Sequence, residues 1–223
     1  MLPEPPAAGG GRTPDAAVTP DALYAVFGES AFGGGLFYAN EPALRFELSR
    51  DGTRVEQFTQ AYDRAREIAR YAFRGSPAFV VVLAWYGEGP PVRHLGVFRS
   101  LRACGVRMTR PWNCWTRTWD DGEEPERRTF VAFRADASAL DGLLWGALAA
   151  DLGIRPRLLA AVYLADPDRG VLLYPYDDRG MDAIGPDRAL LADLYARFHP
   201  YLLAYDLERM RGFFGAPGAD DTP

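Results

Sequence analysis

Hydrophobic positions alternate with polar ones along several short segments, a pattern that is typical of strands. Residues 43–48 place Leu44, Phe46 and Leu48 opposite Ala43, Arg45 and Glu47, which predicts a half-buried strand. Residues 78–86, AFVVVLAWY, are continuously apolar and rich in β-branched side chains, so this strand should be covered on both faces. The same criteria predict two hairpins, formed by strands at residues 112–119 with 127–134 and 158–165 with 171–176.

Other segments repeat apolar residues every three or four positions and are predicted to be helices. The strongest spans residues 53–73, with its apolar positions at Val55, Phe58, Tyr62, Ala65, Ala69 and Ala72 and a charged opposite side that we interpret as solvated. Further helices are predicted near residues 20, 92, 138, 187 and 201. About six strands in hairpins, without regular βαβ alternation, predict an α+β protein with one mainly antiparallel sheet and helices packed on it.

The ends of the chain contrast with this pattern. Residues 1–19 are rich in Pro, Gly and Ala and offer little to bury, and residues 215–223 are similar. We therefore expect a disordered tail at 1–19, a single α+β domain at 20–214 and a second disordered tail at 215–223.

Composition narrows the function classes. The chain has 223 residues and a net charge of −5, and its 25 basic residues are all arginine. An acidic balance disfavours nucleic-acid and anionic-membrane binding, and the absence of lysine excludes lysine-based chemistry. No apolar run approaches a membrane span, and the first residues lack the pattern of a secretory signal, which together predict a cytoplasmic protein.

Cysteine and histidine are too sparse to suggest a cofactor. Cys104 and Cys114 are ten positions apart without a zinc-binding pattern, and His94 and His199 lie on different predicted elements. The sequence therefore predicts no cofactor and assigns no metal ligand set.

Charged residues gather after two apolar, aromatic stretches near the C-terminus. The segment VLLYPYDDRGMD contains Asp177, Asp178, Arg179 and Asp182, and LLAYDLERM contains Tyr205, Asp206 and Arg209. If the second segment packs against the first, three interpretations follow. Arg179 pairs with a carboxylate such as that of Asp206 while Asp177 or Asp178 stabilises the turn; several aspartates hold a hard metal ion; or the patch recognises a complementary protein surface.

Tryptophan marks the strand at residues 112–119. Trp115, Arg117 and Trp119 share one face of it, and Trp112 lies on the other. This pattern fits packing at the rim of the core, a protein-binding hot spot or stacking of single-stranded bases. The following residues, Asp120–Glu126, include five acidic side chains that would repel phosphates, so a nucleic-acid partner is the least favoured.

The C-terminal motifs resemble those of a known family. YDDRGMDAIG followed by LYARFHPYLLAYDLERM is similar to the C-terminal signature of a bacterial family known as domain of unknown function 3885, and FELSRDGTRVEQFTQAYDRAREIARYAF is similar to its N-terminal strand and helix. The family's second motif is closer to DYDR, whereas here Ala204 and Leu207 flank Tyr205-Asp206. The resemblance implies a folded unit and carries no assigned activity.

These observations give two functional hypotheses. The first is a non-enzymatic protein-binding module, in the manner of immunity or antitoxin proteins by analogy. The alternative is a metal-dependent phosphoester hydrolase that uses Asp177, Asp178, Asp182 and Asp206. The candidate binding residues are Trp112, Trp115, Trp119, Asp177, Asp178, Arg179, Asp182, Tyr205, Asp206 and Arg209. The identity of the partner and the oligomeric state stay open.

Overall fold

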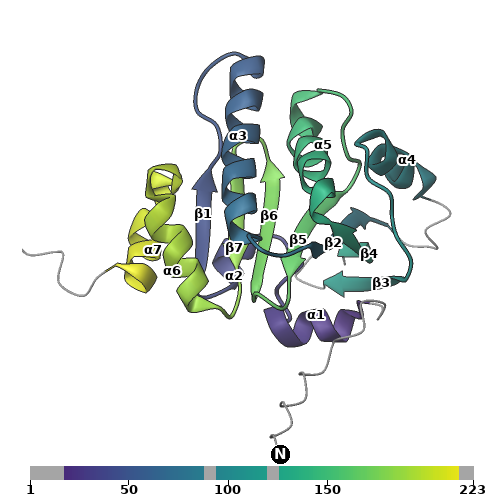
Figure 1. Ribbon diagram of the computed structural model, residues 1–223, viewed down its shortest axis with the longest axis horizontal. Helices are drawn as coiled ribbons and strands as arrows, with labels where there is room; N and C mark the ends of the chain where they lie inside the picture. The colour runs from purple at the N-terminus through teal and green to yellow at the C-terminus, as the bar shows by residue number, and fades with distance from the viewer. Residues whose placement is uncertain (1–17, 88–93, 120–125, 216–223) are drawn as a thin grey trace, which may run out of the picture.

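A seven-stranded antiparallel sheet organises the molecule (Figure 1). The computed structural model describes residues 18–87, 94–119 and 126–215. The strand order is β1-β7-β6-β5-β2-β4-β3, and each neighbouring pair is antiparallel. The strands are β1 Ala43–Glu47, β2 Ala78–Tyr86, β3 Trp112–Trp119, β4 Glu126–Asp136, β5 Ala161–Asp166, β6 Val171–Asp177 and β7 Gly180–Ile184. The predicted α+β architecture is confirmed.

Helices cover both faces of this sheet. They are α1 Pro20–Phe27, α2 Leu36–Ala39, α3 Arg54–Ala72, α4 Leu95–Ala103, α5 Leu140–Leu152, α6 Arg188–Arg197 and α7 Leu207–Phe214, with 3₁₀ turns at Ala137–Ala139, His199–Tyr201 and Ala204–Asp206. Figure 1 shows α3 and α5 in front of the sheet, α2 behind it and α7 at the outer end beyond β1. None of the helices in the described ranges is long and apolar enough to cross a membrane.

Helix α3 begins where its sequence predicts. Thr53 accepts a hydrogen bond from the Glu56 N–H while the Glu56 carboxylate accepts one from the Thr53 N–H, a reciprocal capping box that satisfies two unpaired donors. Phe58 then packs edge-on against Trp145 of α5, with ring centres 4.6 Å apart. Val55 was wrongly placed on the inner face: its side chain is 70% exposed, and Ala61 and Ile68 are buried instead.

The segment before β1 covers the other face of the sheet. Phe32 contacts Trp115 and Tyr163 edge-on, with ring centres 6.4 and 5.4 Å apart, and the Tyr163 hydroxyl donates to the Phe32 carbonyl. Val18 is buried, and Thr19 caps α1 by accepting from the Ala22 N–H. Residues 18 and 19, which were expected in the N-terminal tail, therefore belong to the folded part. Of the tails expected at 1–19 and 215–223, residues 1–17 and 216–223 lie outside the described residues.

Two C-terminal predictions are wrong. Residues 180–184, expected to be part of a turn and loop, form β7, which pairs with both β6 and β1. The expected helix at 201–214 starts only at Leu207, because Leu202 instead forms an antiparallel bridge with Phe46 of β1. The C-terminal segment therefore covers the outer edge of the sheet before it turns into α7.

Candidate functional site

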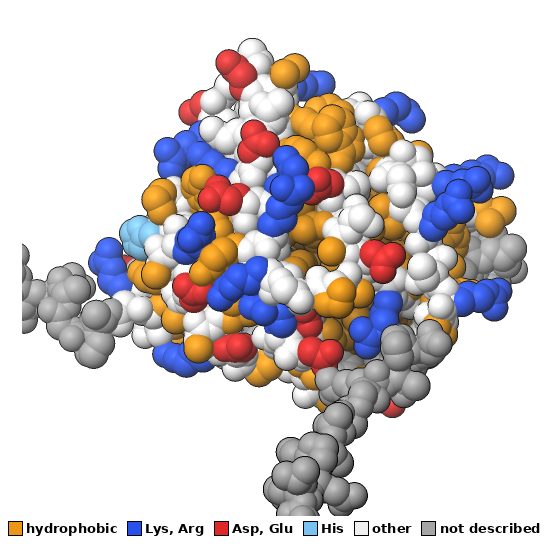
Figure 2. All heavy atoms as spheres, in the orientation of Figure 1, with side chains coloured by type: hydrophobic (Ala, Val, Ile, Leu, Met, Phe, Trp, Pro, Cys, Tyr) orange, Lys and Arg blue, Asp and Glu red, His pale blue; other side chains and the backbone are white. Residues whose placement is uncertain are grey.

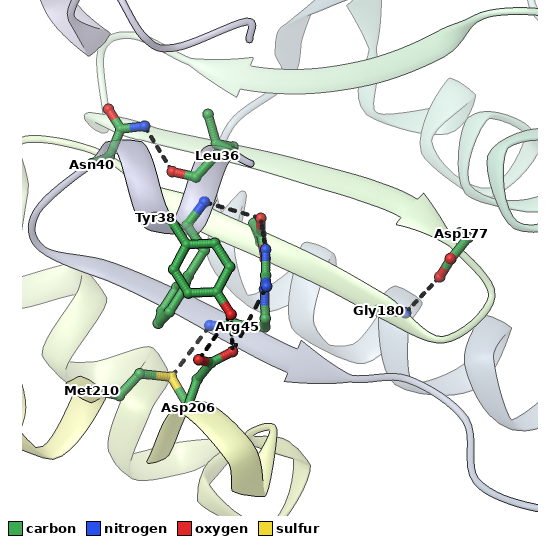
Figure 3. A network of polar contacts seen from close by, with 10 residues as sticks. Leu36, Tyr38, Asn40, Arg45, Asp177, Gly180, Asp206 and Met210 are labelled. Atoms are coloured by element: carbon green, nitrogen blue, oxygen red, sulfur yellow. Dashed lines mark hydrogen bonds and ion pairs between the residues drawn. The ribbon is translucent and has the colours of Figure 1, made fainter. Parts of the chain in front are cut away.

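Arg45 is the centre of the polar cluster to which the predicted C-terminal residues contribute. It lies on β1 directly opposite Asp182 of β7, and the two side chains share one face of the sheet. Arg45 Nε is 2.7 Å from Asp182 Oδ1 and Nη2 is 2.9 Å from Oδ2, which is a bidentate pair. Arg45 Nη1 lies 3.7 Å from Asp206 Oδ2. We call Arg45, Asp182, Asp206 and Tyr38 the Arg45 network (Figure 3).

Helix α2 completes this network from the N-terminal side. The Phe37 N–H donates to Asp182 Oδ2 at 3.1 Å, and the Tyr38 hydroxyl donates to Asp206 Oδ1 at 3.1 Å. The Arg45 guanidinium also lies over the rings of Phe37 and Tyr38, 4.9 and 4.7 Å from their centres. One arginine thus connects β1 and the neighbouring α2 with β7 and the segment before α7, which are distant in sequence.

The charged side chains of the network are almost completely removed from water, whereas Tyr38 is half-exposed. The side chains of Arg45, Asp182 and Asp206 are 13%, 1% and 6% exposed. Burial raises the pKa of the Asp182 carboxyl, while Arg45 and the Phe37 N–H oppose that rise. Burial alone would lower the pKa of Arg45, but the hydrogen bonds to Asp182 and its negative charge raise it above its ordinary value. The pair therefore compensates its own desolvation, and little of the guanidinium is left to bind a ligand.

The turn between β6 and β7 forms a second, separate polar group. Asp177 Oδ1 accepts the N–H groups of Arg179 and Gly180 at 2.8 and 3.1 Å, and Asp177 Oδ2 pairs with the Arg179 guanidinium. Figure 3 shows the contact of Asp177 with Gly180 apart from the cluster around Arg45. The sequence-based interpretation that Arg179 pairs with Asp206 is wrong, because Asp177 holds the Arg179 guanidinium within the turn.

Asp178 is buried in this turn, but its carboxylate forms no hydrogen bond or ion pair with another side chain in the part of the chain that the structure describes. Its residue is 6% exposed. Burial, followed by the negative charge of Asp177, raises the pKa of the Asp178 carboxyl. At neutral pH, the ionised Asp178 carboxylate therefore lowers the stability of the folded state.

The four aspartates do not form the predicted common cluster. Asp182 and Asp206 belong to the Arg45 network, and Asp177 and Asp178 belong to the turn. Within the described ranges, no three His, Cys, Asp or Glu side chains are placed to hold one metal ion. The hydrolase hypothesis thereby loses its proposed ligand set.

The two remaining C-terminal candidates lie at the surface. Tyr205 is 87% exposed, and Arg209 pairs with Glu41 Oε1 at 3.0 Å. Met210, one residue further, is fully buried and accepts the Arg45 N–H at its sulfur, 3.3 Å away. Tyr205 and Arg209 therefore do not form the exposed patch of acidic and arginine side chains that was predicted from the sequence.

The tryptophan strand is more deeply packed than its sequence indicates. Trp115 stacks on Phe130 with ring centres 5.1 Å apart, and its indole N–H donates to the Tyr24 hydroxyl at 3.2 Å. Trp112 is also partly buried against the core. The side chain of Trp119 and the acidic segment 120–125 lie outside what the structure describes. Trp112 and Trp115 therefore contribute to the core and its rim.

Comparison with known families gives a match. The model of the family described as Domain of unknown function (DUF3885) matches residues 20–206. The chain belongs to this family. No curated protein and no solved structure matched the chain. The match to the DUF3885 domain spans α1 to the residue before α7, so it includes every member of the Arg45 network.

Arg45 is the residue that sequence reasoning missed. On a strand read as half-buried, it was assigned to the polar side with Glu47. Tyr38 was missed as well, because α2 is only four residues long. The signal can be interpreted once β7 is known to pair with β1: an aspartate within the otherwise apolar GMDAI segment needs a buried cation, and the single arginine of the facing edge strand supplies it.

Proposed function

We propose that this DUF3885 protein is a non-enzymatic, cytoplasmic protein-binding module that pairs an extended segment of its partner with the outer edge of β3. The observation that carries this proposal is the contrast between the two edges of the sheet. On β1, the Leu203 N–H donates to the Arg45 carbonyl at 3.0 Å, and the Arg45 N–H donates to Met210 Sδ. At Trp112–Thr116 of β3, no backbone hydrogen bond leaves the outer side toward any residue that the structure describes.

The sequence of β3 does not protect this edge. Edge strands usually avoid pairing through lysine, proline, a bulge or a covering segment. Residues 112–119 contain no lysine, proline or acidic residue, and their register with β4 is continuous over eight pairs. Cys114, Thr116 and Thr118 present a small, uncharged exposed face. A regular open edge of this kind supports strand addition, in which the backbone supplies much of the affinity.

The Arg45 network supports a structural role instead of a binding role. Its charged groups satisfy one another and are buried, so it stabilises the β1 end of the sheet. This leaves β3, at the opposite end, as the better place for a partner. It also moves the proposed interface from the acid–arginine region to the tryptophan strand.

Proline substitution at two neighbouring positions tests strand addition. The N–H groups of adjacent strand residues point to opposite sides, so one of Thr116→Pro and Arg117→Pro removes only an outward donor and the other removes a bond to β4. The variant that keeps the wild-type melting temperature is the edge-blocked protein, and Arg117→Ala controls for the lost side chain. Tagged full-length wild type should recover a partner from its native host, and that partner should slow hydrogen exchange in β3.

The edge-blocked variant should lose this partner, whereas Arg117→Ala should keep it. In the isolated chain, part of the β3 amides should exchange much faster than those of β2, which is paired on both sides. The proposal fails if the edge-blocked protein recovers the same partner in the same amount. It also fails if β3 of the isolated chain exchanges as slowly as β2.

A further inference from the structure

Exposed arginines gather immediately before β3. Residues 94–119 contain five arginines and no aspartate or glutamate, although the whole chain carries a net charge of −5. Arg99, Arg102, Arg107 and Arg110 are exposed, and no carboxylate in the described ranges lies within ion-pair distance of them. We call these four residues the arginine cluster. Figure 2 shows arginine side chains on the right of the molecule, where α4 lies in Figure 1.

This arrangement differs from that of other arginines in the same protein. Arg66 and Arg70 share Asp141, Arg74 pairs with Asp193, and Arg179 pairs with Asp177. A structural explanation by ion pairs therefore applies to those residues and not to the arginine cluster. Unpaired cations of one sign raise the local potential and attract negatively charged partners.

An apolar groove lies within the same region. It has a volume of about 270 Å³ and is lined by Phe98, Leu101, Arg102, Val106, Arg107 and Met108. Two members of the arginine cluster thus form part of its wall, beside four apolar side chains. Such a groove suits one bulky apolar side chain whose neighbours are acidic.

The residues that line the groove end close to the open strand edge in the sequence. Met108 is four residues before Trp112, and residues 109–111 connect the two. A partner strand that runs along β3 and extends past Trp112 would therefore pass the segment that lines the groove. One continuous partner segment could then pair with the backbone of β3, place a side chain in the apolar groove and contact the arginines at its rim.

We infer that the partner segment is acidic and extended, with a bulky apolar side chain that enters the α4 groove while its carboxylates contact Arg102 and Arg107. This inference rests on the proposed function and adds the chemistry of the partner to it. A polypeptide is favoured over single-stranded nucleic acid because the open edge offers donors and acceptors at the spacing of a peptide backbone.

Synthetic peptides test the inference with the full-length chain. The probe is a fluorescent peptide of about ten residues, a little longer than a typical strand, that alternates valine and glutamate around a central phenylalanine. One counterpart carries lysine in place of glutamate, and another carries alanine in place of phenylalanine. The protein variants are Arg102→Glu/Arg107→Glu and, as a control with the same change of charge on exposed residues elsewhere, Arg54→Glu/Arg211→Glu.

We expect wild type to bind the glutamate peptide and not the lysine peptide, with an affinity that falls as salt is raised. Arg102→Glu/Arg107→Glu should weaken binding about tenfold or more, and Arg54→Glu/Arg211→Glu should change it little. The alanine counterpart should bind about tenfold more weakly, because the groove loses its apolar occupant. Binding of the glutamate peptide should slow hydrogen exchange in β3.

The other outcomes separate this inference from the proposed function. If the glutamate and lysine peptides bind equally, or the Arg102/Arg107 variant binds as wild type does, the acidic partner is excluded, while slowed exchange in β3 would still support strand addition. If binding depends on these arginines but leaves β3 exchange unchanged, strand addition itself is wrong and the inference falls with it. Tighter, arginine-dependent binding of a single-stranded oligonucleotide also overturns the inference.

Discussion

Arg45 carries a charge into a nearly buried position, and the fold surrounds it with partners from β7, α2 and the segment before α7. A buried charge is tolerated only when its hydrogen bonds and its countercharge are both supplied. Asp182 supplies a bidentate contact, Asp206 a second negative charge, and two aromatic rings cover the guanidinium. The arrangement fixes the position of four segments more than it adds net stability, because both charges were desolvated to form it.

Removing the cation alone should therefore be costly. Arg45→Met leaves the Asp182 carboxylate buried with only the Phe37 N–H, and we expect a loss of about 3–5 kcal/mol in the free energy of unfolding, measured by urea denaturation. The matched control is Arg179→Met, whose guanidinium is 79% exposed and pairs with Asp177; its cost should stay below about 1 kcal/mol. In Arg45→Met/Asp182→Leu, much of the loss should be recovered, because no uncompensated charge remains. Equal costs for Arg45→Met and Arg179→Met would contradict this role.

Substitution of Asp178, in contrast, should stabilise the protein, and the gain in stability should depend on pH. Burial and Asp177 raise its pKa in the folded state above the value of about 3.9 in an unfolded chain. The folded protein therefore holds this proton more tightly, and the contribution of Asp178 to stability falls as pH rises from about 4 through the raised pKa. Asn does not titrate, so Asp178→Asn should be more stable than wild type at neutral pH, and the difference should shrink toward about pH 4.

Urea denaturation at several pH values measures this difference. Asp177→Asn serves as the control, because its carboxylate accepts two backbone N–H groups and pairs with Arg179. That substitution should be destabilising at neutral pH. A destabilising Asp178→Asn that shows no trend with pH would refute the account of Asp178.

At the scale of elements, the sequence predicted a helix or strand correctly where the local apolar pattern determines the structure. The apolar spacing of α3 predicted its extent, and the apolar run of β2 predicted a central strand. β7 could not be recognised, because all five of its residues are buried and no alternation is left to read. The break before α7 was also hidden, since it depends on the pairing of Leu202 with β1, a contact far apart in sequence.

Close packing of helices was equally beyond a reading of the sequence. An ideal Cβ at Gly142 of α5 would lie 2.2 Å from the Cys104 carbonyl oxygen, and one at Gly146 would lie 2.6 Å from Cys104 Sγ. These two glycines allow the end of α4 to lie directly on α5. In the sequence they look only like weak positions within a helix, because their function depends on a neighbour 40 residues away in the chain.

For the whole molecule, the candidate site illustrates the same limit. The sequence identified Asp182 and Asp206 as members of a polar cluster, but assigned them the wrong arginine and added Asp177 and Asp178. Which charges meet was decided by the order β1-β7-β6, which follows from the unpredicted β7. This order also produces a closed edge at β1 and an open edge at β3, and the difference between them is the basis of the proposed function.

Leu202 and Leu203 pair with β1, and α7 adds the contact of Met210 with the Arg45 N–H, so removing α7 should expose part of a second edge. A chain that ends at Asp206 lacks the buried Met210 and its contact with the Arg45 N–H. Burial of such a side chain contributes about 1.5–3 kcal/mol, so the free energy of unfolding should fall by at least that amount, and the melting temperature by roughly 2–4 °C for each kcal/mol. The uncovered strand should also increase self-association, measured by light scattering.

A chain that ends at Gly215 is the control, because it keeps α7 and should melt and scatter as the full-length protein does. Adding the edge-blocking proline of β3 to the chain that ends at Asp206 distinguishes the contributions of the two edges to self-association. Self-association that persists when β3 is blocked must involve β1, whereas self-association that disappears involves β3 alone. If the chain ending at Asp206 stays as stable and as monomeric as the control, α7 does not protect the edge, and the contrast between the two ends of the sheet loses its functional meaning.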